Sequence, residues 1–141
     1  MREYPIPPRW TIYVAVGLGS ALCGALRWVI SVLLQGSPGP GFPWGTLWVN
    51  ASGSFLIGGY AALVAPGGRW SHSLAQRLFF MKVFCVGYTT FSIFSLEAVL
   101  LLQAGRTGLA GAYVGGSLVL WLAGVWAGYA IGAQARWGAA R

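Results

Sequence analysis

The chain has 141 residues, of which 9 are Lys or Arg and 2 are Asp or Glu, so charged residues make up 8% of the sequence, against roughly 25% in an ordinary soluble domain. Hydrophobic residues make up 57% and aromatic residues 15%. A water-soluble fold of this composition lacks the charge needed to cover its surface. The composition therefore excludes a soluble globular domain and predicts a single small integral membrane domain over residues 1–141.

The first two apolar segments are predicted to cross the membrane as helices at 11–34 and 44–64. Each is long enough, since a crossing needs about 20 apolar residues. The first segment contains one charge, Arg27, and is followed by a stretch rich in glycine and proline at 36–43. The second is closed by the turn-forming cluster 65–69.

The third and fourth segments are predicted at 76–103 and 108–133. The middle of the third, Val86–Thr90, is poor in helix formers and rich in hydroxyls that compete with the backbone, so we expect a broken helix. The fourth carries glycines at four-residue spacing, a stripe that lets helices approach closely. The stripe serves packing either within the chain or between subunits; its members are Gly124, Gly128 and Gly132.

Basic residues are distributed unevenly across these four predicted spans. Four spans place both termini and the loop between the second and third spans on one side, which then carries Arg2, Arg9, Arg69, Arg77, Arg136 and Arg141. The opposite side carries only Arg106. Because Lys and Arg near span ends favour the cytoplasmic side, this bias predicts cytoplasmic termini.

The chain offers no set of acids, bases or metal ligands that an enzyme would need. The acidic residues are Glu3 and Glu97, the one histidine is in a loop at His72, and Cys23 and Cys85 lie in apolar runs typical of packing residues. Basic residues are scattered singly, which argues against nucleic-acid binding. Transport, channel activity or a structural subunit role remain.

Two charged residues lie at membrane depth, where charge is costly and usually faces protein or water. Arg27 lies about seven residues from the nearer boundary of the first span, and it either forms an ion pair or extends toward the interface. Glu97 lies toward the end of the third span, either in a vestibule or helix cap or in a buried position.

The densest polar signal is the run from Thr89 to Ser95, TTFSIFS. Phe91 and Phe94 are three residues apart and share a helix face, as do Ser92 and Ser95. Taken alone, the run fits ordinary packing in which serines bond back to their own helix. The predicted break favours an ion pathway, because half-helix ends attract ions and phenylalanine ring edges attract anions without trapping them.

Three stretches resemble the Fluc-type (CrcB) fluoride channels, small four-span proteins that act as antiparallel, dual-topology dimers. They are Arg27 behind the glycines and alanines of the first span, GTLWVNASGSFLIG at 45–58, and GYTTFSIFSLE at 87–97. The last is the most specific. The resemblance extends from about residue 15 to about residue 130.

This resemblance implies passive export of cytoplasmic fluoride through a selective channel in the bacterial inner membrane, without ATP or proton coupling. It makes Asn50 an amide donor, Phe91 and Phe94 ring edges, and Ser92 a hydroxyl donor along the fluoride path. Tyr113 and Ser117 resemble the start of the family's polar track. Trp121, one turn further on, replaces a hydroxyl expected in that track.

Other residues receive structural roles from the same resemblance. Arg27 is the family's single first-span arginine, and Glu97 lies near a pore mouth. A structural sodium ion sits at the dimer centre, held by backbone carbonyls that correspond to Val86 and Thr89. Val86 stands where the family usually has glycine, and its β-branched side chain restricts the local geometry.

Alternatives of other classes stay open at this point. A four-span multidrug or cation exporter needs a carboxylate in the first span, where this chain has Arg27. An accessory membrane subunit leaves the run from Thr89 to Ser95 without a role beyond packing. The partners implied by the resemblance are fluoride, the lipid bilayer and a second copy of the chain; the uneven basic residues also allow an oppositely oriented paralogue.

Overall fold

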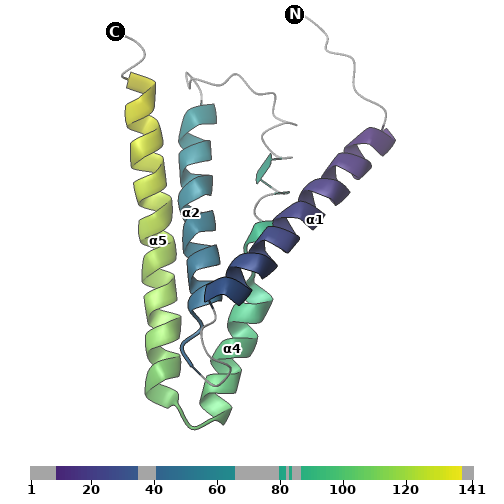
Figure 1. Ribbon diagram of the computed structural model, residues 1–141. Coiled ribbons are helices and arrows are strands. Elements are labelled where there is room, and N and C mark those ends of the chain that lie inside the picture. Colours follow the sequence, from purple (N-terminus) through teal and green to yellow (C-terminus); the bar gives the residue numbers. More distant parts are fainter. Residues whose placement is uncertain (1–8, 35–40, 66–79, 82, 84–86, 138–141) are drawn as a thin grey trace, which may run out of the picture.

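The computed structural model describes residues 9–34, 41–65, 80–81, 83 and 87–137, and nearly all of these residues are helical (Figure 1). The four helices are α1 (Arg9–Leu34), α2 (Trp44–Val64), α4 (Phe91–Gln103) and α5 (Thr107–Trp137). The described residues contain no β-strand. The predicted all-helical fold is therefore confirmed.

Three of these helices are long and apolar enough to cross a membrane. The candidate spans are Val16–Leu34 in α1, Trp44–Val64 in α2 and Thr107–Gln134 in α5. Helix α4 has 13 residues and is therefore about 20 Å long, too short by itself for a hydrocarbon core of about 30 Å. Immediately before it, Thr89 and Thr90 are not helical, whereas Gly87 and Tyr88 are.

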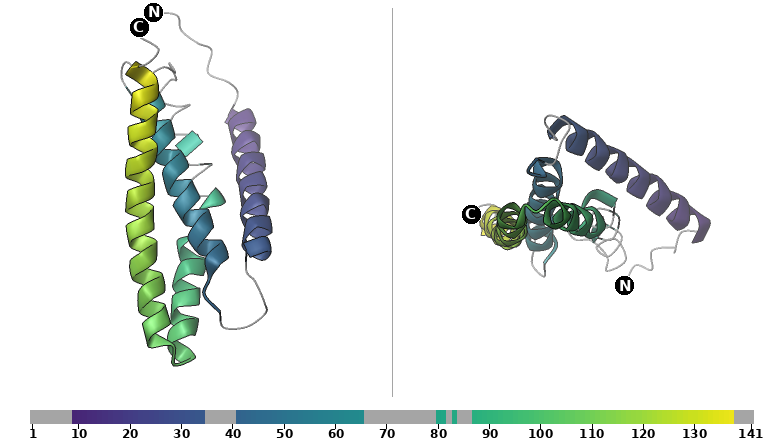
Figure 2. Two further views of the ribbon diagram at one scale, coloured as in Figure 1. Left: turned by 60° about the vertical axis from the view of Figure 1, so that its left-hand side comes forward. Right: turned by 90° about the horizontal axis from the view of Figure 1, so that it is seen from below.

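The helices run alternately up and down (Figure 1). The start of α1 and the ends of α2 and α5 lie at one end of the molecule, and the α4–α5 turn, which contains Arg106, lies at the other. Helix α1 is inclined away from the remaining three, as the right-hand view of Figure 2 also shows. Within the described residues, this path agrees with the predicted arrangement in which both termini and the loop after the second span lie on one side. Four of the arginines counted on that side lie outside the described residues: Arg2, Arg69, Arg77 and Arg141.

Helices α2 and α5 form the most extensive contact of the fold, and the glycine stripe of α5 faces α2. A Cβ atom placed on Gly124 would lie 3.0 Å from the Ala51 carbonyl oxygen, and one on Gly132 would lie 2.8 Å from that of Gly59. A Cβ atom on Gly128 would collide with the carbonyl oxygen of Phe55. The stripe therefore serves packing within the chain.

The connection between α4 and α5 is a glycine-terminated turn. Gly105 has φ of 72°, in the left-handed region that glycine adopts without steric cost. Its N–H donates to the Leu102 carbonyl at 3.0 Å, and the Arg106 N–H donates to the Leu101 carbonyl at 2.9 Å. This pair of bonds is a Schellman motif, which satisfies the last carbonyls of α4 and turns the chain directly into α5.

A small core lies where α2, α4 and α5 meet. Its buried members are Leu47, Phe94, Leu101, Ala110 and Tyr113. Many large apolar side chains are instead exposed, including Leu22 and Trp126, at 72% and 75% exposed area. Exposed apolar surface on this scale is expected where lipid or another membrane helix covers the protein.

Candidate functional site

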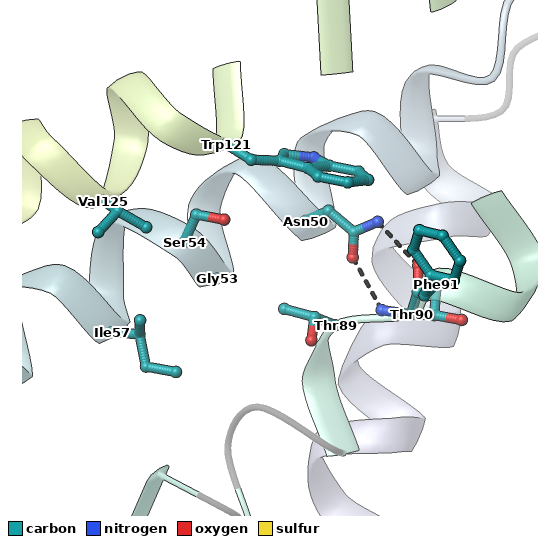
Figure 3. A pocket seen from close by; sticks show the side chains of 9 residues that line it. All are labelled: Asn50, Gly53, Ser54, Ile57, Thr89, Thr90, Phe91, Trp121 and Val125. Atoms are coloured by element: carbon teal, nitrogen blue, oxygen red, sulfur yellow. Dashed lines mark hydrogen bonds between the residues drawn. The ribbon is translucent and has the colours of Figure 1, made fainter. Parts of the chain in front are cut away.

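The non-helical pair before α4 is held by a side chain of α2. Asn50 Nδ2 donates to the Thr90 carbonyl oxygen at 2.8 Å, and Asn50 Oδ1 accepts from the Thr90 N–H at 2.8 Å (Figure 3). Both residues are buried. Because a primary amide has two N–H groups and one is used here, Asn50 retains a second N–H donor.

Thr90 also begins helix α4. Its backbone is extended, with φ of −147° and ψ of 122°, and its hydroxyl oxygen accepts from the Ile93 N–H at 3.3 Å. This is the N-cap arrangement that threonine favours. The same hydroxyl lies 3.3 Å from Ser92 Oγ. The helix therefore starts at Phe91 because Thr90 satisfies one of its unpaired N–H groups.

A cavity of about 240 Å³ lies beside the two hydrogen bonds between Asn50 and Thr90. In Figure 3 the Asn50 amide lies between the Trp121 ring and the Thr90 backbone. The cavity joins α2, the non-helical pair and α5, and its lining residues are Asn50, Gly53, Ser54, Ile57, Thr89, Thr90, Phe91, Trp121 and Val125. Asn50 and Phe91, selected from the sequence for the same pathway, thus share one cavity.

The two phenylalanines of the motif are neighbours with different surroundings. The ring centroids of Phe91 and Phe94 are 5.6 Å apart, with the planes tilted by 45°. Phe91 is 71% exposed, whereas Phe94 is 5% exposed. Phe94 faces the interior of the chain, and Phe91 faces outward from it at the cavity edge.

Phe94 packs against one face of α5. Its ring centroid is 5.1 Å from that of Tyr113 and 4.8 Å from that of Trp121, the latter in an edge-to-face arrangement. Ser117 lies between these two residues on the same face, since positions four apart lie one helical turn apart. It is fully buried, and its hydroxyl has no hydrogen-bond partner among the described residues.

Glu97 joins three helices through its carboxyl group. Its Oε1 accepts from Thr46 Oγ1 of α2 at 2.9 Å, and its Oε2 accepts from the Tyr113 hydroxyl of α5 at 2.7 Å. Thr46 and Tyr113 are buried and Glu97 is half-buried. Both carboxyl oxygens of this α4 residue therefore have donors inside the protein.

The remaining sequence-selected residues lie apart from this group or outside the described residues. Arg27 lies on α1, half-buried, and its Nε has no hydrogen-bond partner in the part of the chain that the structure describes. Ser92 is exposed, beside Thr90. Thr89 is in the non-helical pair, whereas Val86, its expected companion in a sodium site, lies outside the described residues.

Comparisons with known proteins decide the family of this arrangement. The family model described as CrcB-like protein, Camphor Resistance (CrcB), matches residues 14–129. The chain belongs to the CrcB family. With three helices apolar enough to span a bilayer, this membership makes it a multi-pass membrane protein.

Curated CrcB relatives cover most of the chain. The fluoride-specific ion channel FluC 1 of Bradyrhizobium diazoefficiens is 45% identical over 124 residues, 86% of either chain. The fluoride-specific ion channel FluC of Rhodospirillum rubrum is 47% identical over 117 residues, 83% of this chain and 91% of the relative. That of Opitutus terrae is 46% identical over 119 residues, 84% and 90% respectively.

Two contributors to the site were not selected from the sequence. Thr46 binds Glu97, and Thr90 binds Asn50. One signal was present, since Thr46 lies four residues before Asn50 and so shares its face of α2. Thr46 is thus a second polar residue of α2 in this CrcB chain, one helical turn from Asn50 and nearer to the α4–α5 turn.

Proposed function

We propose that this chain forms a fluoride-selective channel through which cytoplasmic fluoride leaves the cell passively, down its electrochemical gradient. The curated relatives reported above are named fluoride-specific ion channels. The observation that carries the location of the path is Ser117, a fully buried hydroxyl without a partner among the described residues. It lies on the α5 face between Tyr113 and Trp121, which both pack against the Phe94 ring.

The proposed path follows the seam between α4 and α5. Fluoride is small and strongly hydrated, so a narrow path must replace its water with several N–H, O–H and ring-edge contacts. Phe94 supplies a ring edge, which carries partial positive charge, and Ser117 supplies a hydroxyl. Tyr113 borders the seam one turn away, where its own hydroxyl donates to Glu97.

Asn50 and Phe91 form the part of the path that opens to the cavity. The second N–H of Asn50 donates to fluoride, while the first holds the Thr90 carbonyl. Phe91 presents its ring at the cavity edge, and Ser92 adds a hydroxyl nearby. Arg27 lies on α1, apart from these residues, and in this proposal it has a vestibule or structural role.

We propose that two copies assemble in opposite orientations and that the third span is one helix broken at Thr89 and Thr90. The exposure of Phe91, 71% in the single chain, supports a partner at this face. The shortness of α4, 13 residues, supports the broken span. The second chain is either another copy of this one or an oppositely oriented paralogue. The uneven basic residues favour the paralogue.

A structural sodium ion at the dimer centre belongs to the same proposal. Unwound backbone at membrane depth offers carbonyl oxygens of the kind that coordinate Na⁺. Thr89 belongs to such a pair, which fits this donor chemistry, and Val86 would supply the other carbonyl. The ion would supply positive charge that holds carbonyls of two chains together.

Fluoride efflux from liposomes tests the proposed function. The purified chain is reconstituted into vesicles loaded with potassium fluoride, and release is followed with a fluoride electrode after valinomycin sets the membrane potential. We expect rapid fluoride release and no chloride release from matched vesicles loaded with potassium chloride. Absence of fluoride release from vesicles that contain folded protein in both orientations would refute the channel.

Assembly is tested in the same vesicles. Single cysteines at opposite ends of the molecule, Ala104→Cys next to the α4–α5 turn and Gln134→Cys near the end of α5, both at exposed positions, are labelled with a membrane-impermeant maleimide in a variant that lacks Cys23 and Cys85. A homodimer in both orientations gives half-labelling at either position. Complete labelling at one end together with no fluoride release would instead require a paralogous partner, and adding that partner should then restore release.

A further inference from the structure

Trp121 carries a buried hydrogen-bond donor that the packing of the described residues leaves without an acceptor. Its indole Nε1 is inaccessible to solvent and has no hydrogen-bond partner among the described residues. The residue lies near the middle of α5, Thr107–Trp137. It is therefore far from the membrane interfaces, where tryptophan N–H groups ordinarily meet water or lipid headgroups.

A second unpartnered polar atom lies one turn away on the same helix. Ser117 Oγ is also buried without a partner among the described residues, and residues four apart on a helix are separated by about 6 Å along its axis. Both residues lie on the face of α5 that also carries Tyr113, and Phe94 packs against Tyr113 and Trp121. The two residues with unpartnered donors therefore border the same part of the seam between α4 and α5.

Phe94 closes this position on the side of α4. Its ring packs edge-to-face on Trp121, with centroids 4.8 Å apart and planes at 66°, and it also contacts Tyr113, one turn before Ser117. Trp121 in turn lines the cavity that contains Asn50 and Phe91. Trp121 is thus the residue of α5 that contacts both the Phe94 seam and this cavity.

The chemistry of the indole decides which ligand fits. An indole N–H only donates and cannot accept a hydrogen bond or ligate a cation. We infer that the Trp121 N–H, together with the Ser117 hydroxyl, binds a permeating anion where the α4–α5 seam meets the cavity, and that Trp121 thereby helps the pore select fluoride. This inference rests on the proposed fluoride channel.

Selectivity follows from the rigidity of the indole donor. Fluoride accepts shorter hydrogen bonds than chloride does, and the Trp121 ring is packed against Phe94. A rigid N–H on a packed ring keeps its position better than a freely rotating hydroxyl. The bulk of the indole also limits the room for a larger halide beside the Phe94 ring.

The test compares Trp121→Phe, which keeps an aromatic ring but removes the N–H, with Trp126→Phe. Trp126 lies on the same helix and is 75% exposed, so its substitution controls for loss of an indole. Both variants are reconstituted, and initial fluoride efflux is measured beside the unmodified chain. We expect Trp121→Phe to slow efflux about tenfold, as for the loss of one hydrogen bond, and Trp126→Phe to leave it unchanged.

A binding readout separates this inference from the function itself. Indole ¹H–¹⁵N resonances of the protein in detergent are followed during titration with sodium fluoride and with sodium chloride, and that of Trp121 is assigned by its loss in Trp121→Phe. We expect a saturable shift with fluoride alone. If the unmodified chain releases fluoride but Trp121→Phe matches it and the resonance does not move, the inference is wrong and the channel stands. If the unmodified chain is present in both orientations, releases no fluoride and shows no movement of the resonance, both fail.

Discussion

Asn50 binds the backbone of Thr90 through both polar atoms of its amide, donating to the carbonyl oxygen and accepting from the N–H, each at 2.8 Å. The two residues are 40 positions apart in the sequence. This reciprocal pair ties α2 to the two non-helical residues that precede α4. A residue to which the family resemblance assigns an anion-donor role therefore also holds the backbone of the site in place.

The first prediction concerns this pair of hydrogen bonds between Asn50 and Thr90. Asn50→Ala leaves the buried N–H and carbonyl of Thr90 without partners, and each unsatisfied group costs about 1–3 kcal/mol. We expect a lower unfolding midpoint in detergent together with loss of fluoride efflux. The control is Ser95→Ala, since among the described residues the Ser95 hydroxyl donates to the Phe91 carbonyl of its own helix alone, at 2.9 Å. Equal unfolding midpoints for the two variants would contradict a stabilising role of the hydrogen bonds between Asn50 and Thr90.

The second prediction concerns the approach of α2 and α5. Gly128→Ala forces a methyl group against the Phe55 carbonyl, and overpacking of this kind costs about 1–3 kcal/mol. Gly111→Ala, in the same helix, meets nothing within 4 Å and should stabilise the helix by roughly 0.5–1 kcal/mol. Thermal unfolding should therefore shift in opposite directions, and a shift of the same sign in both would show that the close contact is wrong.

The third prediction concerns the carboxyl group between three helices. Tyr113→Phe removes the hydroxyl that donates to Glu97 Oε2 at 2.7 Å, and we expect it to destabilise the protein by about 1–3 kcal/mol. Tyr129→Phe is the matched change on α5, at a residue that is 47% exposed. Urea titration of both variants in mild detergent measures the difference between their free energies of unfolding. If the hydrogen bond to Glu97 stabilises the protein, this difference is well above zero.

The fourth prediction separates the two phenylalanines. Phe94→Ala removes a buried ring, which costs about 3–5 kcal/mol, whereas Phe91→Ala removes a ring that is 71% exposed in the single chain and should cost its fold less than about 1 kcal/mol. Both should slow fluoride efflux. Circular dichroism during heating, paired with efflux on the same samples, checks this. Preserved efflux in Phe91→Ala would remove that ring from the path.

The helices of this protein could be predicted from its sequence because apolar runs and turn-forming residues are local signals. The stretches between Arg27 and Arg69 and between Arg106 and Arg136 lack Asp, Glu, Lys and Arg altogether, and a polar, glycine-bearing turn precedes α5. The start of α4 was also readable in outline, since a threonine before an apolar run is an N-cap signal.

The pairing of polar side chains could not be predicted in the same way. Thr46 and Glu97 are 51 residues apart, and a hydroxyl in an apolar helix gives no sign of which distant group it will meet. The partner of the glycine stripe was equally open, because close packing within a chain and between chains selects the same small residues. Such contacts depend on helix rotation and crossing angle, which hydropathy does not determine.

The α4–α5 seam is tested most directly by the initial rate of fluoride efflux in Ser117→Ala, measured beside Ser95→Ala in vesicles that contain equal amounts of folded protein. Each variant loses one hydroxyl, but only that of Ser117 is buried without a partner among the described residues. We expect about tenfold slower efflux for Ser117→Ala, as for one lost hydrogen bond, and an unchanged rate for Ser95→Ala. Equal, undiminished rates in both variants would contradict a fluoride path between α4 and α5.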